Sequence, residues 1–231
     1  MLSDVMEDYL KTIFRLQETT EPPIAPSQIG DRLGVTTPTV TSMMETLEER
    51  GLVSREKYAG VELTEEGETV ALEILRHHRL LEAYLDEHLD YAWSEVHEEA
   101  EVLEHHISEE FESRVAEVLD HPATDPHGDP IPGMDLEPIA DDTTPLSRFE
   151  AGSRVRVCRV RDSEPEILSH LAEIGIEPGT ELELKAVTPL EVYQVAVGEE
   201  IRHLPESTAE AVRVQPVTDE STDVPRQEQQ A

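Results

Sequence analysis

The 231-residue sequence is poor in cysteine, aromatic residues and long apolar runs. Its single cysteine, Cys158, excludes an internal disulfide framework and is typical of a protein kept in a reducing cytoplasm. No run of about 18 apolar residues is present, so we expect no transmembrane helix and no membrane partner. The N-terminus has no basic stretch followed by an apolar core, which argues against a secretory signal. We therefore expect a soluble cytoplasmic protein of two or three small domains.

Positive charge is also scarce, because 18 Lys and Arg residues stand against 52 Asp and Glu residues, which gives a net charge of −34. Such a balance ordinarily argues against a nucleic-acid partner. Residues 1–60, however, hold only 10 of the acids and 6 of the bases, so 42 acids and 12 bases lie in residues 61–231. Only three of the bases are lysine. This acidic, lysine-poor composition is typical of extreme halophiles and leaves a DNA-binding N-terminal segment possible.

The N-terminal segment has the layout of a winged helix-turn-helix. Apolar residues recur at spacings of three and four over 3–18, which predicts an amphipathic helix. Two short helices follow, over 26–33 and about 37–50, and Gly34 provides the turn between them. Alternating residues over 53–63 predict a hairpin directly after the second short helix. This order favours a DNA-binding domain, and the alternative is the same motif used for protein contacts.

The second short helix would enter the major groove with its N-terminal face. That face carries hydroxyl groups and a proline ring, which suit phosphates and thymine methyl groups. No Arg or Asn occupies its first turn, so we expect weak direct base readout and a larger contribution from DNA shape. The predicted DNA-contacting residues are Thr36, Thr37, Pro38, Thr39, Thr41 and Ser42, with Arg32, Arg50, Arg55 and Lys57 as phosphate-neutralising groups.

The rest of the chain predicts a mainly α protein with β structure at its C-terminal end. Helical periodicity runs from about Glu65 to Leu119, with a break near 89–92 and Ser94 as a helix N-cap. A proline-rich stretch follows, and from Arg148 the period becomes two, which predicts a small five-stranded barrel interrupted by one helix over about 165–174. The predicted parts are a DNA-binding domain (1–70), a helical domain (71–122), a linker (123–146), a small β-barrel domain (147–217) and a disordered tail (218–231).

Histidines and carboxylates recur at helical spacing in the helical region. Four of them share one face of a helix predicted over 96–111, namely His97, Glu101, Glu104 and His105. His78 and Glu82 are four residues apart on the preceding helix, and Asp8 lies among apolar neighbours on the first. Imidazoles and carboxylates that converge from different helices suit octahedral Mn(II) or Fe(II), and also Co, Ni or Zn. The alternative is a solvated acidic face, because such spacings arise by chance in so acidic a chain.

Several segments, taken together and in their order along the chain, resemble the diphtheria toxin repressor family of metal-dependent regulators, including its manganese-transport-regulator branch. They are MEDYLKTI, LEERGLV, EKYAGVELTEEG, HRLLEAYL, VHEEAEVLEHHIS and HGDPIPG. The similarity covers about residues 3–133. Residues 147–217 resemble the family's C-terminal SH3-like domain, which also occurs in ferrous-iron transport accessory proteins. The resemblance implies a homodimeric, metal-dependent repressor that binds a double-stranded DNA operator and controls metal-uptake genes.

The same resemblance implies two metal sites per subunit for Mn(II) or Fe(II). The primary site falls on Asp8, Glu101, Glu104 and His105; the ancillary site falls on His78, Glu82 and His97, completed by Glu164 with Glu166 as a second candidate. Iron-type members carry sulfur ligands at the positions of Asp8 and Glu101, whereas the manganese type carries carboxylates. The manganese type also has a second carboxylate one turn after Asp8, where this chain has Lys11. We therefore expect two separated sites. The resemblance gives a mixed signal on the metal, because the primary ligands are of the manganese type, whereas the ancillary site and the three-domain layout are of the iron type.

Two other functions fit parts of the sequence. A winged-helix regulator could respond to an organic ligand, and its DNA binding would then be insensitive to chelators. A metalloenzyme could be built on a helical carboxylate bundle, but such sites use paired Glu-x-x-His motifs and residues 70–121 contain none. We therefore expect no enzymatic activity.

Overall fold

The computed structural model describes residues 2–56, 59–136, 142–161 and 165–217, without the side chains of 165 and 166. Lys57, Glu164, the tail 218–231 and the side chain of Glu166 thus lie outside the described part. The chain divides into two compact units, Met1–Ala140 and Asp141–Ala231, which are described separately. No helix among the described residues is long and apolar enough to cross a membrane.

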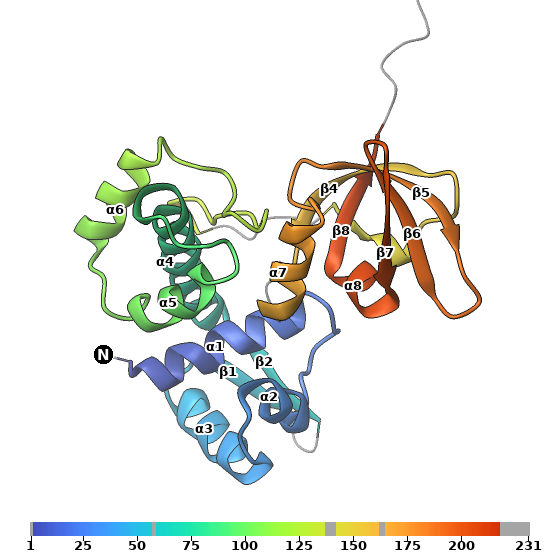
Figure 1. Ribbon diagram of the computed structural model, residues 1–231. Coiled ribbons are helices and arrows are strands. Elements are labelled where there is room, and N and C mark those ends of the chain that lie inside the picture. Colours follow the sequence, from blue (N-terminus) through green and yellow to red (C-terminus); the bar gives the residue numbers. More distant parts are fainter. Residues whose placement is uncertain (1, 57–58, 137–141, 162–164, 218–231) are drawn as a thin grey trace, which may run out of the picture. The chain divides into compact units, whose positions relative to one another are not determined.

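The first unit begins with the predicted winged helix (Figure 1). Its elements are α1 (Asp4–Gln17), α2 (Pro26–Leu33), α3 (Thr37–Glu49), β1 (Val53–Glu56) and β2 (Gly60–Leu63). Gly34 ends α2 in the left-handed conformation with a φ of 66°, which glycine adopts without steric cost. The hairpin forms where it was predicted, and in it Val53 pairs with Leu63 and Arg55 with Val61. The predicted helix-turn-helix and wing are confirmed.

One feature of the winged helix, in the segment that follows α1, was not predicted. Ile24 of that segment pairs with Val61 of β2 as an extra strand position, through N–H···O distances of 2.7 and 3.0 Å. A Cβ on Gly60 would lie 2.0 Å from the carbonyl oxygen of Ile24. The close approach of these two chains therefore requires glycine at position 60.

Three helices form the rest of the first unit: α4 (Glu65–Leu89), α5 (Val96–Leu103) and α6 (Glu109–Val118). Thr64 is the N-cap of α4, and its hydroxyl accepts a hydrogen bond from the N–H of Gly67 at 3.1 Å. Leu80 of α4 packs with Val115 and Ala116 of α6, while Leu81 packs with Ala100 of α5. The apolar stripe of α4 thus holds both shorter helices.

The helix predicted over 96–111 is wrong in two respects. Glu95, not Ser94, is the N-cap of α5, and α5 ends at Leu103 with Glu104 as its C-cap. A new helix starts after Ser108, whose hydroxyl accepts a hydrogen bond from the N–H of Phe111 at 3.3 Å. His105 therefore lies in a turn after α5 and not on its helical face, so its position depends on tertiary contacts.

The first part of the predicted linker is packed on α4. Arg79 donates to the carbonyl oxygen of Pro130 at 2.6 Å, and Arg76 donates to that of Pro132 at 2.6 Å. Ile131 joins the core between α4 and α6, and Asp125 is buried. Residues 122–133 are therefore an integral part of the first unit, with alternate residues buried from 125 to 131, and we call them the α4-bound loop.

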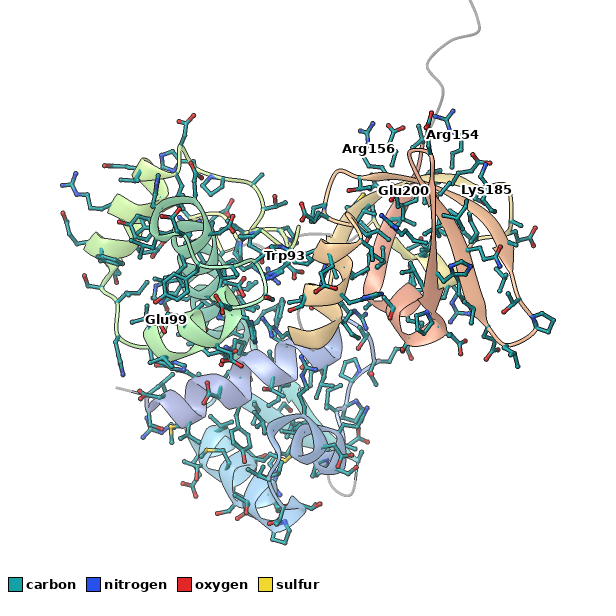
Figure 2. The ribbon with its side chains drawn as sticks, in the orientation of Figure 1. Trp93, Glu99, Arg154, Arg156, Lys185 and Glu200 are labelled. Atoms are coloured by element: carbon teal, nitrogen blue, oxygen red, sulfur yellow. The ribbon has the colours of Figure 1, made fainter. Side chains whose placement is uncertain are left out.

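The second unit is an antiparallel sheet with short helices. Its elements are β3 (Thr144–Pro145), a 3₁₀ turn (Leu146–Arg148), β4 (Arg154–Val160), α7 (Pro165–Glu173), β5 (Glu181–Val187), β6 (Val192–Val197), β7 (Glu200–Pro205), α8 (Glu206–Ala211) and β8 (Val212–Pro216). The strand order is β3-β8-β4-β5-β6-β7, so the described strands form a six-stranded antiparallel sheet that does not close on itself, where a five-stranded barrel was predicted. Arg154 and Arg156 lie on β4, where both pair with Glu181 of β5 (Figure 2). The predicted helix near 165–174 is confirmed as α7, whereas α8 was not predicted.

Candidate metal centre

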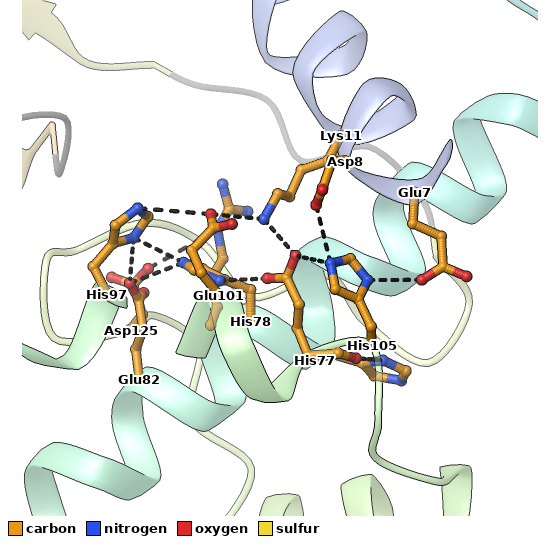
Figure 3. Close-up of polar contacts among 12 residues, drawn as sticks. Glu7, Asp8, Lys11, His77, His78, Glu82, His97, Glu101, His105 and Asp125 are labelled. Atoms are coloured by element: carbon orange, nitrogen blue, oxygen red, sulfur yellow. Dashed lines mark hydrogen bonds and ion pairs between the residues drawn. The ribbon is translucent and has the colours of Figure 1, made fainter. Parts of the chain in front are cut away.

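Among the described residues of the first unit, three groups of histidines and carboxylates bring ligand atoms within 4.8 Å of one another. The first cluster is Asp8, Glu104 and His105. The second cluster, as we define it, is His78, Glu82 and His97, with Glu101 beside the two histidines. The third cluster is Glu82, Asp125 and His127. Figure 3 shows the first two clusters connected in one polar network beside α1.

The first cluster joins α1 to the end of α5. His105 Nε2 lies 3.0 Å from Asp8 Oδ1 and 3.4 Å from Glu104 Oε1. His105 Nδ1 lies 2.7 Å from Glu7 Oε2, and a carboxylate can only accept this hydrogen bond. In a neutral ring, Nε2 then carries a lone pair that faces two carboxylate oxygens, an arrangement that a bound cation stabilises. Glu7, which was not predicted, thus sets the tautomer of the predicted ligand His105.

Lys11 occupies the space between the predicted carboxylate ligands. Its buried ammonium donates to Glu101 Oε1 at 2.8 Å and to Glu104 Oε1 at 2.5 Å. This ion pair draws Glu101 away from the first cluster, and the Glu101 carboxylate lies instead 3.7 Å from His97 Nε2. Of the four residues predicted for the primary site, three therefore converge directly and the fourth is held beside them by Lys11.

The second cluster has the spacing of ligands around one ion. His78 Nε2, His97 Nδ1 and Glu82 Oε1 form a triangle with sides of 3.0, 3.1 and 3.0 Å. For a metal–ligand distance of about 2.1 Å, ligands at right angles lie about 3.0 Å apart and tetrahedral ligands about 3.4 Å apart. The triangle thus has the dimensions of one face of an octahedron.

Glu104 connects the first two clusters. Its Oε1 faces Lys11 and His105, whereas its Oε2 accepts a hydrogen bond from His78 Nδ1 at 2.6 Å. This bond leaves His78 Nε2 as the nitrogen that faces the second cluster. Glu104 is fully buried. A carboxylate with one oxygen at each cluster makes the occupancy of one site sensitive to that of the other.

The pKa shifts follow from burial and opposite charges. Burial raises the pKa of Asp8. Burial alone would lower the pKa of His78 and His105. Nearby carboxylates outweigh burial and raise both pKa values above the ordinary histidine value. These carboxylates are Glu82 and Glu104 for His78, and Glu7, Glu104 and Asp8 for His105. Burial would raise the pKa of Glu101, but the Lys11 ammonium outweighs burial and lowers this pKa. Protons and cations therefore compete for these groups.

The third cluster contains two residues that the sequence analysis assigned to a linker. Asp125 and His127 belong to the α4-bound loop and are buried beside Glu82 of α4. Burial and the nearby carboxylates of Glu82 and Asp129 raise the pKa of Asp125 well above its ordinary value. The spacing Asp-x-His was visible in the sequence, but three flanking prolines and two glycines indicated an exposed segment.

The predicted DNA-contacting face of α3 is exposed. Thr36, Thr37, Pro38, Thr39 and Ser42 are exposed and Thr41 is half-buried. Thr36 and Thr39 share a hydrogen bond of 2.9 Å, and Thr41 donates to the carbonyl oxygen of Thr37 at 3.0 Å. Arg32 and Arg50 are exposed, whereas Arg55 lies 3.4 Å from both Glu45 and Glu48 of α3. Arg55 must exchange these partners before it can neutralise a phosphate.

Comparisons with known proteins agree with this architecture along nearly the whole chain. Residues 1–61 match the iron-dependent repressor N-terminal DNA-binding domain. Residues 64–133 match the iron-dependent repressor metal-binding and dimerisation domain, and residues 144–216 match the FeoA domain. The second match includes the whole α4-bound loop.

Individual relatives cover most of the chain. It is 35% identical over 228 residues to the iron-dependent repressor IdeR of Mycobacterium tuberculosis (strain ATCC 25618 / H37Rv), covering 94% of this chain and 99% of the relative. It is 32% identical over 193 residues to the diphtheria toxin repressor of Corynebacterium diphtheriae (strain ATCC 700971 / NCTC 13129 / Biotype gravis), covering 79% and 85%.

Solved structures are similar over the same length. A manganese-dependent transcriptional repressor in complex with manganese is 35% identical, with a TM-score of 0.86 over 92% of this chain and 100% of that chain. The manganese regulator SloR is 32% identical, with a TM-score of 0.77 over 92% and 98%. Domain order, fold and sequence identity together show that this chain belongs to the iron-dependent repressor family.

Proposed function

We propose that this protein is a Mn(II)-responsive repressor of metal-uptake genes, in which a cation at the first cluster controls DNA binding. The observation that carries the proposal is the position of Asp8. Its carboxylate comes from α1, which packs on α2 within the winged helix, yet lies 3.0 Å from His105 beyond α5. A cation held by Asp8, Glu104 and His105 would therefore fix the winged helix against the helical part of the unit.

The donor set supports Mn(II) over softer ions. All candidate ligands in the three clusters are carboxylate oxygens or imidazole nitrogens. The single cysteine, Cys158, is outside the first unit, so residues 1–140 of the chain offer no thiolate. Hard oxygen donors favour Mn(II), and Fe(II) is the second choice for the same ligands. When bound, the ion would supply the positive charge that these carboxylates lack.

A dimer is part of the proposal, because two recognition helices must match two half-sites about one helical turn apart. The helical part exposes large apolar side chains that a partner subunit could cover. They are Leu89 on α4, Val102 on α5, and Phe111 and Val118 on α6. We propose that the dimer interface lies within residues 70–120, where these exposed side chains are available to it. The contribution of Glu164 and Glu166 to the second cluster stays a prediction.

The test is DNA binding by fluorescence anisotropy, with a duplex selected from a random library by the protein in Mn(II). Titrations with Mn(II), Fe(II) and chelator should be run at low salt and in molar KCl, because so acidic a chain can depart from the usual salt dependence. We expect tight binding only with metal. Removing two first-cluster ligands (Glu104→Gln with His105→Gln) should abolish the metal response.

A matched control changes the same residue types on the exposed side of the same segment (Glu98→Gln with His106→Gln), since Glu98 and His106 are exposed. This control should respond to Mn(II) like the unaltered protein. A first-cluster variant that folds and keeps its full metal response would contradict the proposal. DNA binding that ignores chelator would instead favour a regulator that responds to an organic ligand.

A further inference from the structure

The third cluster lies apart from the ligands that the family resemblance assigns, except for Glu82. Glu82 and His127 are fully buried, and Asp125 is 6% exposed. Their ligand atoms lie within 4.8 Å of one another. Because Asp125 and His127 come from the α4-bound loop and Glu82 from the middle of α4, the packing of that loop creates the group.

The orientation of His127 is fixed by a backbone group. Its Nε2 lies 2.9 Å from the carbonyl oxygen of Trp93, and a carbonyl can only accept a hydrogen bond. Trp93 (Figure 2) is itself held in place, because its indole N–H donates to the carbonyl oxygen of Pro126 at 2.8 Å. Nε2 therefore carries the proton of neutral His127, and Nδ1 faces Glu82 Oε2 at 3.7 Å. An imidazole that donates one N–H to a carbonyl while its other nitrogen faces carboxylates is the usual arrangement of a metal ligand.

Glu82 faces two different groups of histidines with its two oxygens. Oε1 contacts His78 and His97 at 3.0 and 3.1 Å. Oε2 is completely enclosed, has no hydrogen bond within 3.5 Å in the described part of the chain, and points to His127. A buried carboxylate oxygen without a hydrogen bond is costly unless a cation satisfies it. The two oxygens of Glu82 are thus placed to serve two neighbouring ions.

The buried carboxylates near Glu82 Oε2 favour a divalent cation. Glu82, Asp125 and Asp129 are buried carboxylates, and Arg79 is the cation beside the last two. Its guanidinium lies 3.9 Å from Asp125 Oδ2 and 3.7 Å from Asp129 Oδ1, beyond hydrogen-bond distance. Carboxylates from α4 and from the α4-bound loop are thus buried near one another, and a divalent ion held between Glu82 and Asp125 would offset their repulsion.

We propose that Glu82, Asp125 and His127 form a third binding site for a divalent first-row cation, with Glu82 shared between this site and the second cluster. Two oxygen donors and one imidazole suit Mn(II), Fe(II) or Zn(II). The site rests on the proposed function only through the shared ligand Glu82. It ties the α4-bound loop to α4, so it stabilises the helical part of the unit independently of the contact between α1 and α5.

The experiment is equilibrium dialysis of the full chain against Mn(II), with bound metal measured by mass spectrometry. We expect three Mn(II) ions per chain. The double variant Asp125→Asn with His127→Gln should bind two. Asn keeps the oxygen that accepts hydrogen bonds from the N–H groups of His127 and Asp129 at 2.8 and 2.9 Å, which preserves the turn. The matched control is Asp120→Asn with His121→Gln, because both residues are exposed just before the α4-bound loop; it should bind three.

Equal stoichiometry in the unaltered protein and in the folded Asp125→Asn, His127→Gln variant would overturn the third site. If that variant fails to fold, the single change His127→Gln is dialysed against Mn(II) in the same way. Two ions per folded chain support the third site, and three contradict it. These outcomes are independent of DNA binding, so they leave the proposed function in place. Failure of the Glu104→Gln, His105→Gln variant to lose its metal response would refute the function alone.

Discussion

Replacing Lys11 by leucine should tighten Mn(II) binding at the first cluster. The buried Lys11 ammonium lies 2.5 Å from Glu104 Oε1, an oxygen that a cation at this cluster would share. Leucine keeps an apolar stem of similar length, has high helix propensity and offers no ligand atom. Arginine at the same position keeps the charge and serves as the matched control.

The magnitude follows from the separation of the charges. An ion about 2.1 Å from Glu104 Oε1 would lie within roughly 5 Å of the Lys11 nitrogen. The repulsion between a double and a single charge at that distance is about 2 kcal/mol in water and about 7 kcal/mol at an effective dielectric constant of 20. Lys11 can retain Glu101 and move away from the ion, so we use the lower figure, which corresponds to a gain in affinity of roughly 30-fold. The change also leaves Glu101 and Glu104 without their ammonium partner, which favours a dication further.

Isothermal calorimetry with Mn(II) measures this gain in affinity, and thermal unfolding in chelator measures the stability of the metal-free protein. Without metal, the Lys11→Leu variant should be destabilised by about 3–5 kcal/mol, because one partner of a buried ion pair has been removed. Mn(II) should restore most of that loss. The Lys11→Arg variant keeps the charge, so its gain in Mn(II) affinity and its loss of stability without metal should both be smaller. Mn(II) affinity of Lys11→Leu equal to or below that of the unaltered protein would show that Lys11 does not compete with the metal.

Three further predictions concern protons, the tautomer of His105 and backbone packing. Mn(II) affinity should rise with pH through the range above about 6.5, because the raised pKa values of His78 and His105 mean that protons leave on binding. Without metal, the protonated rings stabilise the fold below that pH. This stabilisation is lost as the pH rises through the folded-state pKa values of the two histidines. Calorimetry in buffers of different ionisation enthalpy counts the protons, and a pH-independent affinity contradicts the shifts. Glu7→Gln should weaken Mn(II) binding by about 10- to 100-fold by loosening the orientation of His105, and an unchanged dissociation constant would exclude that role. Gly67→Ala should lower the free energy of unfolding by about 3 kcal/mol in urea titrations, because its Cβ would lie 1.9 Å from the carbonyl oxygen of Leu52; an unshifted midpoint would mean that the chain relaxes freely.

The order of helices and the winged helix were predictable because local patterns decide them. Gly34 and the Thr37–Pro38 helix start are strong local signals, and the hairpin register follows from alternation. The break at Glu104 was missed because helical periodicity continues through the adjacent histidines. Ser108 followed by two glutamates was the available N-cap signal for α6, and it was outweighed by the apparent helical face.

The candidate site was predictable as a set of ligands but not as a network. Helical spacing and family resemblance together indicated Asp8, Glu104 and His105, which converge in the first cluster. Lys11 was noted only as a substitution, whereas its ion pairs decide where Glu101 points. Asp125 and His127 could not be found, because prolines indicate a linker and no local pattern reveals that the segment is buried against α4. Such positions depend on long-range packing.

The central claim is that one cation ties α1 to the end of α5 and thereby couples metal binding to DNA binding. Its most direct test is reciprocal: the affinity for Mn(II) is measured with and without the selected duplex, and the affinity for the duplex with and without Mn(II). The account predicts the same enhancement factor in both directions, and its loss in Asp8→Asn. Full coupling in the folded Asp8→Asn variant, or no coupling in the unaltered protein, would contradict it.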